Sequence, residues 1–255
     1  MIIRKSPDEI EAMARAGQVV VETLELLGEH VQPGVTTLEL DGIAEEFIRS
    51  QGGTPTFKGY RGFPGSICAS PNSMVVHGIP GPYRLEEGDV ISIDVGVTLD
   101  GFVGDSAYTF GVGEIDADAQ RLLDVCQAAL AAGIEEARPD NHIGDIAAAV
   151  QRTTETAGFA VVRSLVGHGV GRSMHEEPQV PNFGEPGRLQ RLRPGMTIAI
   201  EPMITAGSAH VWVGDDQWSI STEDGSLAAH FEHTVAVTEE GPRILTQARA
   251  GSLLR

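Results

Sequence analysis

Cysteine, aromatic residues and basic residues are all scarce in this chain of 255 residues, and each scarcity excludes a class of protein. The two cysteines, Cys68 and Cys126, are too few for a disulfide framework and fit a reducing compartment. Lysine and arginine number 18 against 36 acidic residues, and the resulting net charge of −18 repels phosphate backbones. We therefore expect no specific nucleic-acid partner.

Long apolar runs are missing too. No stretch approaches the roughly 18 consecutive apolar residues of a membrane-spanning helix. The segment from Met1 to Pro7 has no apolar signal-peptide region. These absences predict a cytoplasmic protein that does not enter membranes.

Glycine is plentiful, at 31 residues, and a hydrophobic content of 41% can bury a sizeable core. Capping signals followed by apolar residues at helical spacing predict four helices. One is capped by Ser6 and stopped at Pro33-Gly34, one is capped by Thr36 and ends at Gly52-Gly53, one is capped by Asp116 and ended by Pro139, and one carries Ile143 to Val150 and stops near Gly158. Strands are predicted at Ile67–Ser70, Val90–Val97, Tyr108–Val112, Phe159–Val162, Thr197–Ile200 and Thr234–Val237.

Two segments of the chain align with each other without gaps. Leu85–Asp94 matches Leu192–Glu201 at a leucine, a glycine and two isoleucines, and an acid ends each segment. Chance similarity between two strands is one reading. The other is an internal duplication that places both acids at equivalent positions about a pseudo-twofold axis. We expect a single catalytic domain over residues 1–255, with pseudo-symmetric halves of about 1–112 and 113–255.

Carboxylates occur where the sequence predicts buried strands. Asp94 and Glu201 each end an apolar β-branched run, and Asp105 and Glu232 begin strand-like segments. A lone buried carboxylate costs several kcal/mol unless it is paired, hydrogen-bonded or bound to a metal. Each acid alone could be a strand-end carboxylate bonded to backbone. Four acids together with the glycine-flanked His168, and with no lysine near them, favour a metal centre.

The chemistry of these side chains indicates which metals they hold. Oxygen and nitrogen ligands without a thiolate suit Co, Mn or Fe better than a structural zinc site. Four carboxylates balance two divalent ions, and such a pair binds a bridging water, lowers its pKa and clamps a tetrahedral intermediate. We therefore predict a hydrolase with two divalent metal ions held by Asp94, Asp105, His168, Glu201 and Glu232.

The ordered set of ligands, with the aspartates eleven positions apart, resembles the type I methionine aminopeptidases of the pita-bread fold. The supporting segments are Val76-His77-Gly78-Ile79-Pro80, Gly167-His168-Gly169-Val170-Gly171-Arg172, His175-Glu176-Glu177-Pro178, Ala199-Ile200-Glu201-Pro202 and Phe231-Glu232-His233-Thr234. The likeness spans Ile3 to Leu245. It implies an α+β fold in which duplicated α/β halves surround a curved antiparallel sheet. It also implies that the initiator methionine is removed from nascent proteins when the second residue is small.

The resemblance implies a role for each ligand. Asp94 would chelate one ion, His168 and Glu201 would bind the other, and Asp105 and Glu232 would bridge both.

It likewise implies roles for residues beside the metals. Glu201 would act as the acid and base that handles the proton of water, and His77 and His175 would position the peptide and stabilise the oxyanion. A local turn is the competing interpretation of His77. His30, His142 and His210 are expected at the surface, and His230 and His233 are expected behind the ligands or in a purely structural role.

The methionine pocket of the family would fall on Tyr60, Phe63, Cys68 and Trp218. Core packing competes as an explanation for Tyr60 and Phe63. Met174 departs from the family, which commonly has an aromatic residue just before this histidine, so the shape of the pocket stays open.

Two other functions are weaker alternatives. The proline-directed relatives, aminopeptidase P and prolidase, share the five ligands but carry a large domain ahead of the catalytic one, whereas 76 residues precede His77 here. A non-catalytic pita-bread protein that binds partners would have lost ligands. We expect a monomer that acts on the N-termini of nascent polypeptides. Transient association with the ribosome is left open by a small basic cluster at Arg188, Arg191 and Arg193.

Overall fold

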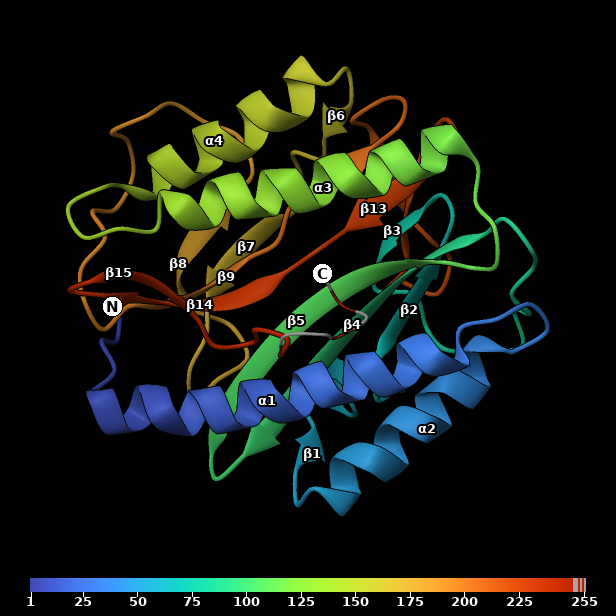
Figure 1. Ribbon diagram of the computed structural model, residues 1–255, viewed down its shortest axis with the longest axis horizontal. Coiled ribbons are helices and arrows are strands. Elements are labelled where there is room, and N and C mark those ends of the chain that lie inside the picture. Colours follow the sequence, from blue (N-terminus) through green and yellow to red (C-terminus); the bar gives the residue numbers. More distant parts are fainter. Residues whose placement is uncertain (250–251, 253, 255) are drawn as a thin grey trace.

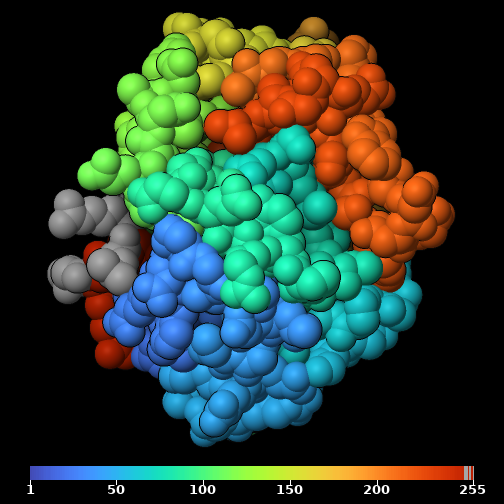
Figure 2. All heavy atoms as spheres, turned by 90° about the vertical axis from the view of Figure 1, so that its right-hand side faces the viewer, coloured from blue at the N-terminus to red at the C-terminus, as the bar shows by residue number. Residues whose placement is uncertain are grey.

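The computed structural model describes residues 1–249, 252 and 254. Its four helices lie over one side of several antiparallel sheets. Figure 1 shows α1 and α2 together at one end of the molecule and α3 and α4 at the other, and the same division by colour is visible in Figure 2. The helices are α1 (Pro7–His30), α2 (Thr37–Ser50), α3 (Ala117–Glu135) and α4 (Ile143–Thr156), with a short 3-10 turn, η1, at Tyr60–Gly62. All four predicted helices are present, and the α+β arrangement is confirmed.

Side-chain caps explain where the helices begin. The side chains of Ser6 and Thr36 each accept a hydrogen bond from the backbone N–H three residues later. The carboxylates of Glu9 and Glu39 in turn accept from the backbone N–H of the capping residue. Asp116 accepts from the backbone N–H of Ala119 at the start of α3. These local bonds set the helix starts that the sequence predicts.

The strands fall into two groups by position in the chain. The first half contributes β1 (Thr54–Pro55), β2 (Cys68–Pro71), β3 (Met74–Val76), β4 (Val90–Leu99) and β5 (Phe102–Gly111). The second half contributes β6 (Ala160–Val161), β7 (Val166–Gly169), β8 (Glu176–Pro181), β9 (Thr197–Ile200), β10 (Met203–Thr205), β11 (Val211–Val213), β12 (Ile220–Thr222), β13 (Ala228–His230), β14 (His233–Thr238) and β15 (Gly241–Ile244).

One strand prediction was wrong at its start. The strand expected at Tyr108–Val112 begins six residues earlier, as β5, because Asp100 and Gly101 close a tight hairpin with β4. Both turn residues have positive φ, at 51° and 78°, as a two-residue hairpin turn requires. Asp105 consequently lies inside a long strand instead of at its beginning.

The two main sheets have matching parts. In the first half, β4 pairs with β5 and β2, and in the second half β9 pairs with β14 and β7. One apolar cluster lies under α1 and α2 and another under α3 and α4, and Tyr108 packs against both. The ring of Tyr108 therefore marks the junction between the halves. Within the described part of the chain, none of the helices combines the length and apolarity needed to cross a membrane.

Candidate metal centre

The four acids reach one point from two antiparallel strand pairs. Asp94 on β4 lies opposite Ala107 of β5, and Asp105 on β5 lies opposite Gly96 of β4. Glu201 directly follows β9, and Glu232 directly precedes β14, the partner of β9. Each half thus supplies two acids from one strand pair, as the internal duplication predicts.

Hydrogen bonds between β5 and β14 hold the halves together at the acids. The backbone N–H of Glu232 donates to the carbonyl of Ala107 over 3.0 Å, and the Ser106 hydroxyl donates to the carbonyl of Glu232. The Thr234 hydroxyl donates to the carbonyl of Asp105 over 2.8 Å. These bonds are buried, so they fix the backbones of Asp105 and Glu232 relative to each other.

Close backbone packing explains the glycines beside His168. A Cβ at Gly167 would lie 2.4 Å from the carbonyl oxygen of Ala199, and one at Gly169 would lie 2.2 Å from that of Glu177. Only glycine lets β7 fit between its neighbours at this distance. His168 Nδ1 lies 2.9 Å from the carbonyl of Gly169, a bond that holds the proton on Nδ1 and leaves Nε2 as a lone-pair donor.

The ligand atoms converge as a metal site requires. His168 Nε2 lies 3.6 Å from Asp105 Oδ2 and 3.5 Å from Glu201 Oε1. Asp105, His168 and Glu232 each offer one ligand atom within 4.8 Å of the others. All four acids and His168 line a single cavity of about 210 Å³. The structure therefore brings together all five residues that the sequence predicts as ligands.

Burial and mutual repulsion shape the titration of the cluster. Burial raises the pKa of Asp94 well above its ordinary value, and the charges of Asp105 and Glu201 raise it further. Burial also raises the pKa of Glu201 and of Glu232, and the neighbouring carboxylates add to the effect. Burial lowers the pKa of His168 to about 4, so its ring is neutral at pH 7. Divalent cations would neutralise this repulsion.

Unpartnered oxygens test whether the site fits a metal. Asp94 Oδ1, Asp105 Oδ1 and Glu232 Oε1 are buried without a hydrogen-bond partner. A carboxylate oxygen left in that state is costly unless a cation binds it. Cys68 also lines the cavity, but burial first, and then the nearby carboxylates, raise the pKa of its thiol well above the usual range. The donors are therefore oxygens and an imidazole nitrogen, which fit a divalent ion.

Two histidines lie at the mouth of the cavity. Burial lowers the pKa of His77, whose backbone has a φ of 60°, a strained conformation for a residue with a side chain. The Nδ1 atom of His175 lies 2.9 Å from the Tyr60 hydroxyl, in a hydrogen bond. The His175 ring is tilted against that of His168, with the two centroids 4.2 Å apart. Burial, followed by the charge of Arg61, lowers the pKa of His175.

The predicted methionine pocket forms the apolar end of the same cavity. Phe63 and Trp218 make an edge-to-face pair with centroids 5.1 Å apart. Tyr60, Cys68 and Met174 line the cavity with them. Further residues that line it were not assigned to the pocket from the sequence, because only the folded chain brings them to the cavity: Phe57, Arg61, Val76, Leu165, Val166 and Met203.

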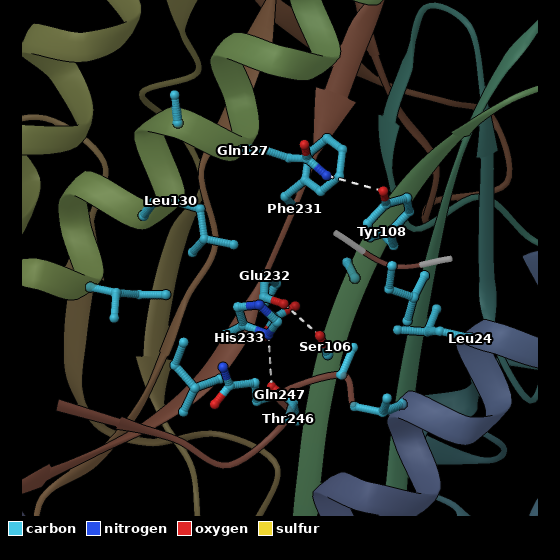
Figure 3. A pocket seen from close by; sticks show the side chains of 18 of the residues that line it. Leu24, Ser106, Tyr108, Gln127, Leu130, Phe231, Glu232, His233, Thr246 and Gln247 are labelled. Atoms are coloured by element: carbon cyan, nitrogen blue, oxygen red, sulfur yellow. Dashed lines mark hydrogen bonds between the residues drawn. The ribbon is translucent and has the colours of Figure 1, made fainter. Parts of the chain in front are cut away.

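A larger cavity of about 720 Å³ lies on the opposite side of β5 and β14. Figure 3 shows Ser106, Tyr108 and His233 among the side chains that line it. Ser106 and Tyr108 are two residues apart on β5 and therefore share one face of the strand. His233 bonds there to the Thr246 hydroxyl at 3.0 Å, and the Tyr108 hydroxyl accepts from Gln127 over 3.1 Å. Asp94, Asp105, His168 and Glu201 line the smaller cavity and not this one, and Glu232 lines both, so the metal chemistry belongs to the smaller cavity.

Comparison with known proteins gives a consistent result. The profile of "Metallopeptidase family M24" matches residues 11–239. The methionine aminopeptidase of Clostridium perfringens is 53% identical over 246 residues, covering 96% of this chain and 99% of the relative. Methionine aminopeptidase 1 of Bacillus subtilis is 51% identical, covering 97% of this chain and all (100%) of the relative. The crystal structure of methionine aminopeptidase from Rickettsia prowazekii superposes with a TM-score of 0.96 at 40% identity, over 97% of this chain and 100% of that one.

Proposed function

The chain belongs to metallopeptidase family M24, and from this premise we propose that it removes the amino-terminal methionine of polypeptides at a centre of two divalent ions. Near-full-length relatives that share half of its residues carry the activity itself. The cluster of buried carboxylates with unpartnered oxygens supports the metal count. Asp94 would hold one ion, His168 and Glu201 the other, and Asp105 and Glu232 both.

Divalent ions bound here would lower the pKa of a coordinated water and polarise the scissile carbonyl. We identify Co, Mn and Fe as suitable ions from the oxygen and nitrogen donors.

Glu201 is placed to take the proton of the attacking water. Its side chain lines the cavity between His168 and the acids, and burial together with the charge of Asp105 raises its pKa. A carboxylate with a raised pKa is a better proton acceptor near pH 7. Glu201 then returns the proton to the leaving amine.

His77 and His175 would hold the substrate. We infer that the Tyr60 hydroxyl donates to His175 Nδ1, which leaves the proton on Nε2 and directs it toward the peptide carbonyl. Because burial keeps both imidazoles neutral, they can donate to a developing oxyanion without adding charge to the metal centre.

Phe63, Trp218, Tyr60 and Cys68 would accept the methionine side chain. The 210 Å³ cavity suits one unbranched apolar side chain beside the reacting centre. A thioether gains from the aromatic edges that Phe63 and Trp218 present.

The partners we propose are the N-termini of nascent polypeptides, met by a cytoplasmic monomer. Both cysteines are free and buried, which fits a reducing compartment. The basic cluster offers little for lasting ribosome contact, since Arg191 pairs with Asp140 at 2.8 Å and Arg188 with Glu185 at 3.5 Å. Any such association would be transient and sensitive to salt.

Cleavage of a Met-X-Ser peptide series, with X running from Gly to Ile, tests the substrate assignment. We expect fast release of methionine when X is Gly or Ala and little when X is Ile, because a branched second side chain would crowd His77 and His175. Equal rates across the series, or faster release of a first-position alanine, would contradict the proposal.

A further inference from the structure

His230 ends β13 two residues before Glu232, and the reaction above gives it no task. Only 2% of its surface is exposed, and its Nε2 atom is buried without a hydrogen-bond partner. Leaving a polar atom buried without a hydrogen-bond partner has a free-energy cost. Such a cost at this position calls for an explanation in the site itself.

The unpartnered nitrogen faces two acids that come from different strands. It lies 3.8 Å from Glu232 Oε2 and 4.0 Å from Glu201 Oε2. Both distances exceed the length of a hydrogen bond by less than about 1 Å. A small movement of the side chains would bring these atoms within hydrogen-bond distance. Since the residues lining the catalytic cavity do not include His230, the two acids separate it from the substrate.

Glu201 consequently lies between two histidines. Its Oε1 faces His168 Nε2 at 3.5 Å on the cavity side, and its Oε2 faces His230 on the buried side. Each oxygen of this carboxylate thus has its own nitrogen neighbour. One oxygen of Glu201 can therefore bind a metal while the other accepts a hydrogen bond from His230.

The backbone of His230 is fixed by its neighbours. Its N–H donates to the Thr109 hydroxyl over 3.0 Å, and its carbonyl accepts from the same hydroxyl over 2.8 Å. On β13 it is paired with Met203 of β10. The ring therefore cannot move far from the acids without breaking strand contacts.

His233, one residue after Glu232, provides a contrast. Figure 3 shows it facing the larger cavity, where Nδ1 lies 3.0 Å from the Thr246 hydroxyl. Both histidines are close to Glu232 in the chain, but they differ in direction: His233 bonds to Thr246, whereas Nε2 of His230 lies within 4.0 Å of Glu201 and Glu232.

We propose that His230 is a positioning residue whose Nε2–H donates to the Oε2 atoms of Glu201 and Glu232 and turns their other oxygens toward the metals. A hydrogen bond to a carboxylate favours its charged form, which is the form that binds cations. Partners of this kind typically contribute 10–100-fold to metal affinity. The proposal rests on the proposed function only in requiring that these acids bind metal.

Calorimetric titration of the chelator-treated protein with Mn²⁺ tests this role. His230→Leu should weaken binding by about 10–100-fold, whereas His230→Gln, whose amide can still donate, should stay within about threefold of the parent. His233→Leu is the matched control, and it should lower the free energy of unfolding while leaving the affinity within about threefold. Parent-like affinity in His230→Leu, or failure of His230→Gln to restore binding, would overturn the proposal.

A second measurement is made on the unaltered sequence and uses a variant only to assign one signal. In zinc-loaded protein with ¹⁵N-labelled histidine, long-range ¹H–¹⁵N correlations report which ring nitrogen carries the proton. We expect the Nε2–H tautomer for His230, identified as the spin system that is missing from His230→Gln, and the Nδ1–H tautomer would overturn the proposal. Metal binding without release of methionine from Met-Ala-Ser would instead contradict the proposed function and leave this role intact.

Discussion

Four carboxylates are crowded behind one cavity, and at the scale of single residues this crowding has a measurable consequence. Burial raises the pKa of Asp94, Asp105, Glu201 and Glu232, and repulsion among them adds to the rise for three of the four. A folded protein with raised carboxyl pKa values keeps protons that the unfolded chain has already lost. The contribution of these carboxyl groups to stability is therefore largest below their ordinary pKa of about 4. It is lost as pH rises toward their folded-state pKa values.

We expect the chelator-treated protein to lose this contribution to stability as pH rises from 5 to 8, measured by urea unfolding. Asp94→Asn should flatten the trend, because it removes one of the interacting charges. Excess Mn²⁺ should reverse the trend, since metal binding needs the deprotonated carboxylates. If the metal-free protein instead became more stable between pH 5 and 8 and Asp94→Asn changed nothing, the repulsion would not exist.

Met174 concerns specificity and not the metals. It is buried beside the pocket, with Phe63 and Trp218 in the same apolar cluster. Met174→Phe exchanges a flexible thioether for a rigid ring of similar bulk. We expect kcat on Met-Ala-Ser to stay within about tenfold, ~1.4 kcal/mol, because the ring reaches no reacting atom.

His77→Ala is the comparison for that variant. It removes a group at the mouth of the metal cavity, so its loss in kcat/KM should be larger than that of Met174→Phe. A greater loss in Met174→Phe would mean that the pocket, and not His77, positions the peptide.

At the scale of elements, a buried ion pair fixes the loop that carries Met174 and His175. Lys5 Nζ lies 2.6 Å from Glu176 Oε2, and the two side chains are only 3% and 8% exposed. The other oxygen of Glu176 accepts from the backbone N–H groups of Arg172 and Ser173. The segment ahead of α1 is thereby tied to β8 and to His175, which directly precedes β8.

Lys5→Met would leave Glu176 buried and unpaired, which typically costs about 3–5 kcal/mol. We expect that loss in urea unfolding, together with a lower kcat/KM as His175 loses its fixed position. The double variant Lys5→Met/Glu176→Gln keeps the acceptor for the backbone but removes the charge, so it should recover part of the stability. A double variant less stable than Lys5→Met would contradict this explanation.

The elements also show what the sequence could and could not predict. Helix starts at Ser6, Thr36 and Asp116 depend on caps a few residues away, so local patterns suffice. The short strands β3 and β10 to β13 pair with segments far away in the sequence; Ile220, for example, pairs with Val76. Local sequence patterns cannot predict such pairing. The convergence of Asp94, Asp105, Glu201 and Glu232 on one cavity was predictable, because acids in apolar strands are conspicuous. For His230 the sequence left two roles open, behind the ligands or purely structural, because the direction of its ring depends on where β13 ends.

At the scale of the whole molecule, the halves meet at the metal centre. The β5–β14 bonds at Ser106 and Thr234 join them, and Tyr108 packs in both apolar clusters. We propose on this basis that residues 1–255 form one catalytic domain with halves of about 1–112 and 113–255.

A single domain should unfold in one transition. Tryptophan occurs only at Trp212 and Trp218, in the second half, whereas far-ultraviolet circular dichroism reports the helices of both. We expect the two probes to give coincident urea transitions, with and without metal. Two separated midpoints would show that the halves unfold independently.

The central claim is that this metal centre removes amino-terminal methionine. The most direct measurement is the rate of methionine and alanine release from an equimolar mixture of Met-Ala-Ser and Ala-Pro-Ser, first with chelator-treated protein and then as Mn²⁺ or Co²⁺ is restored. Without metal we predict no release of either amino acid. As the ion is added, methionine release should rise to a plateau while the alanine of Ala-Pro-Ser remains in its peptide. Methionine release that persists in chelator, or alanine released faster than methionine, would contradict it.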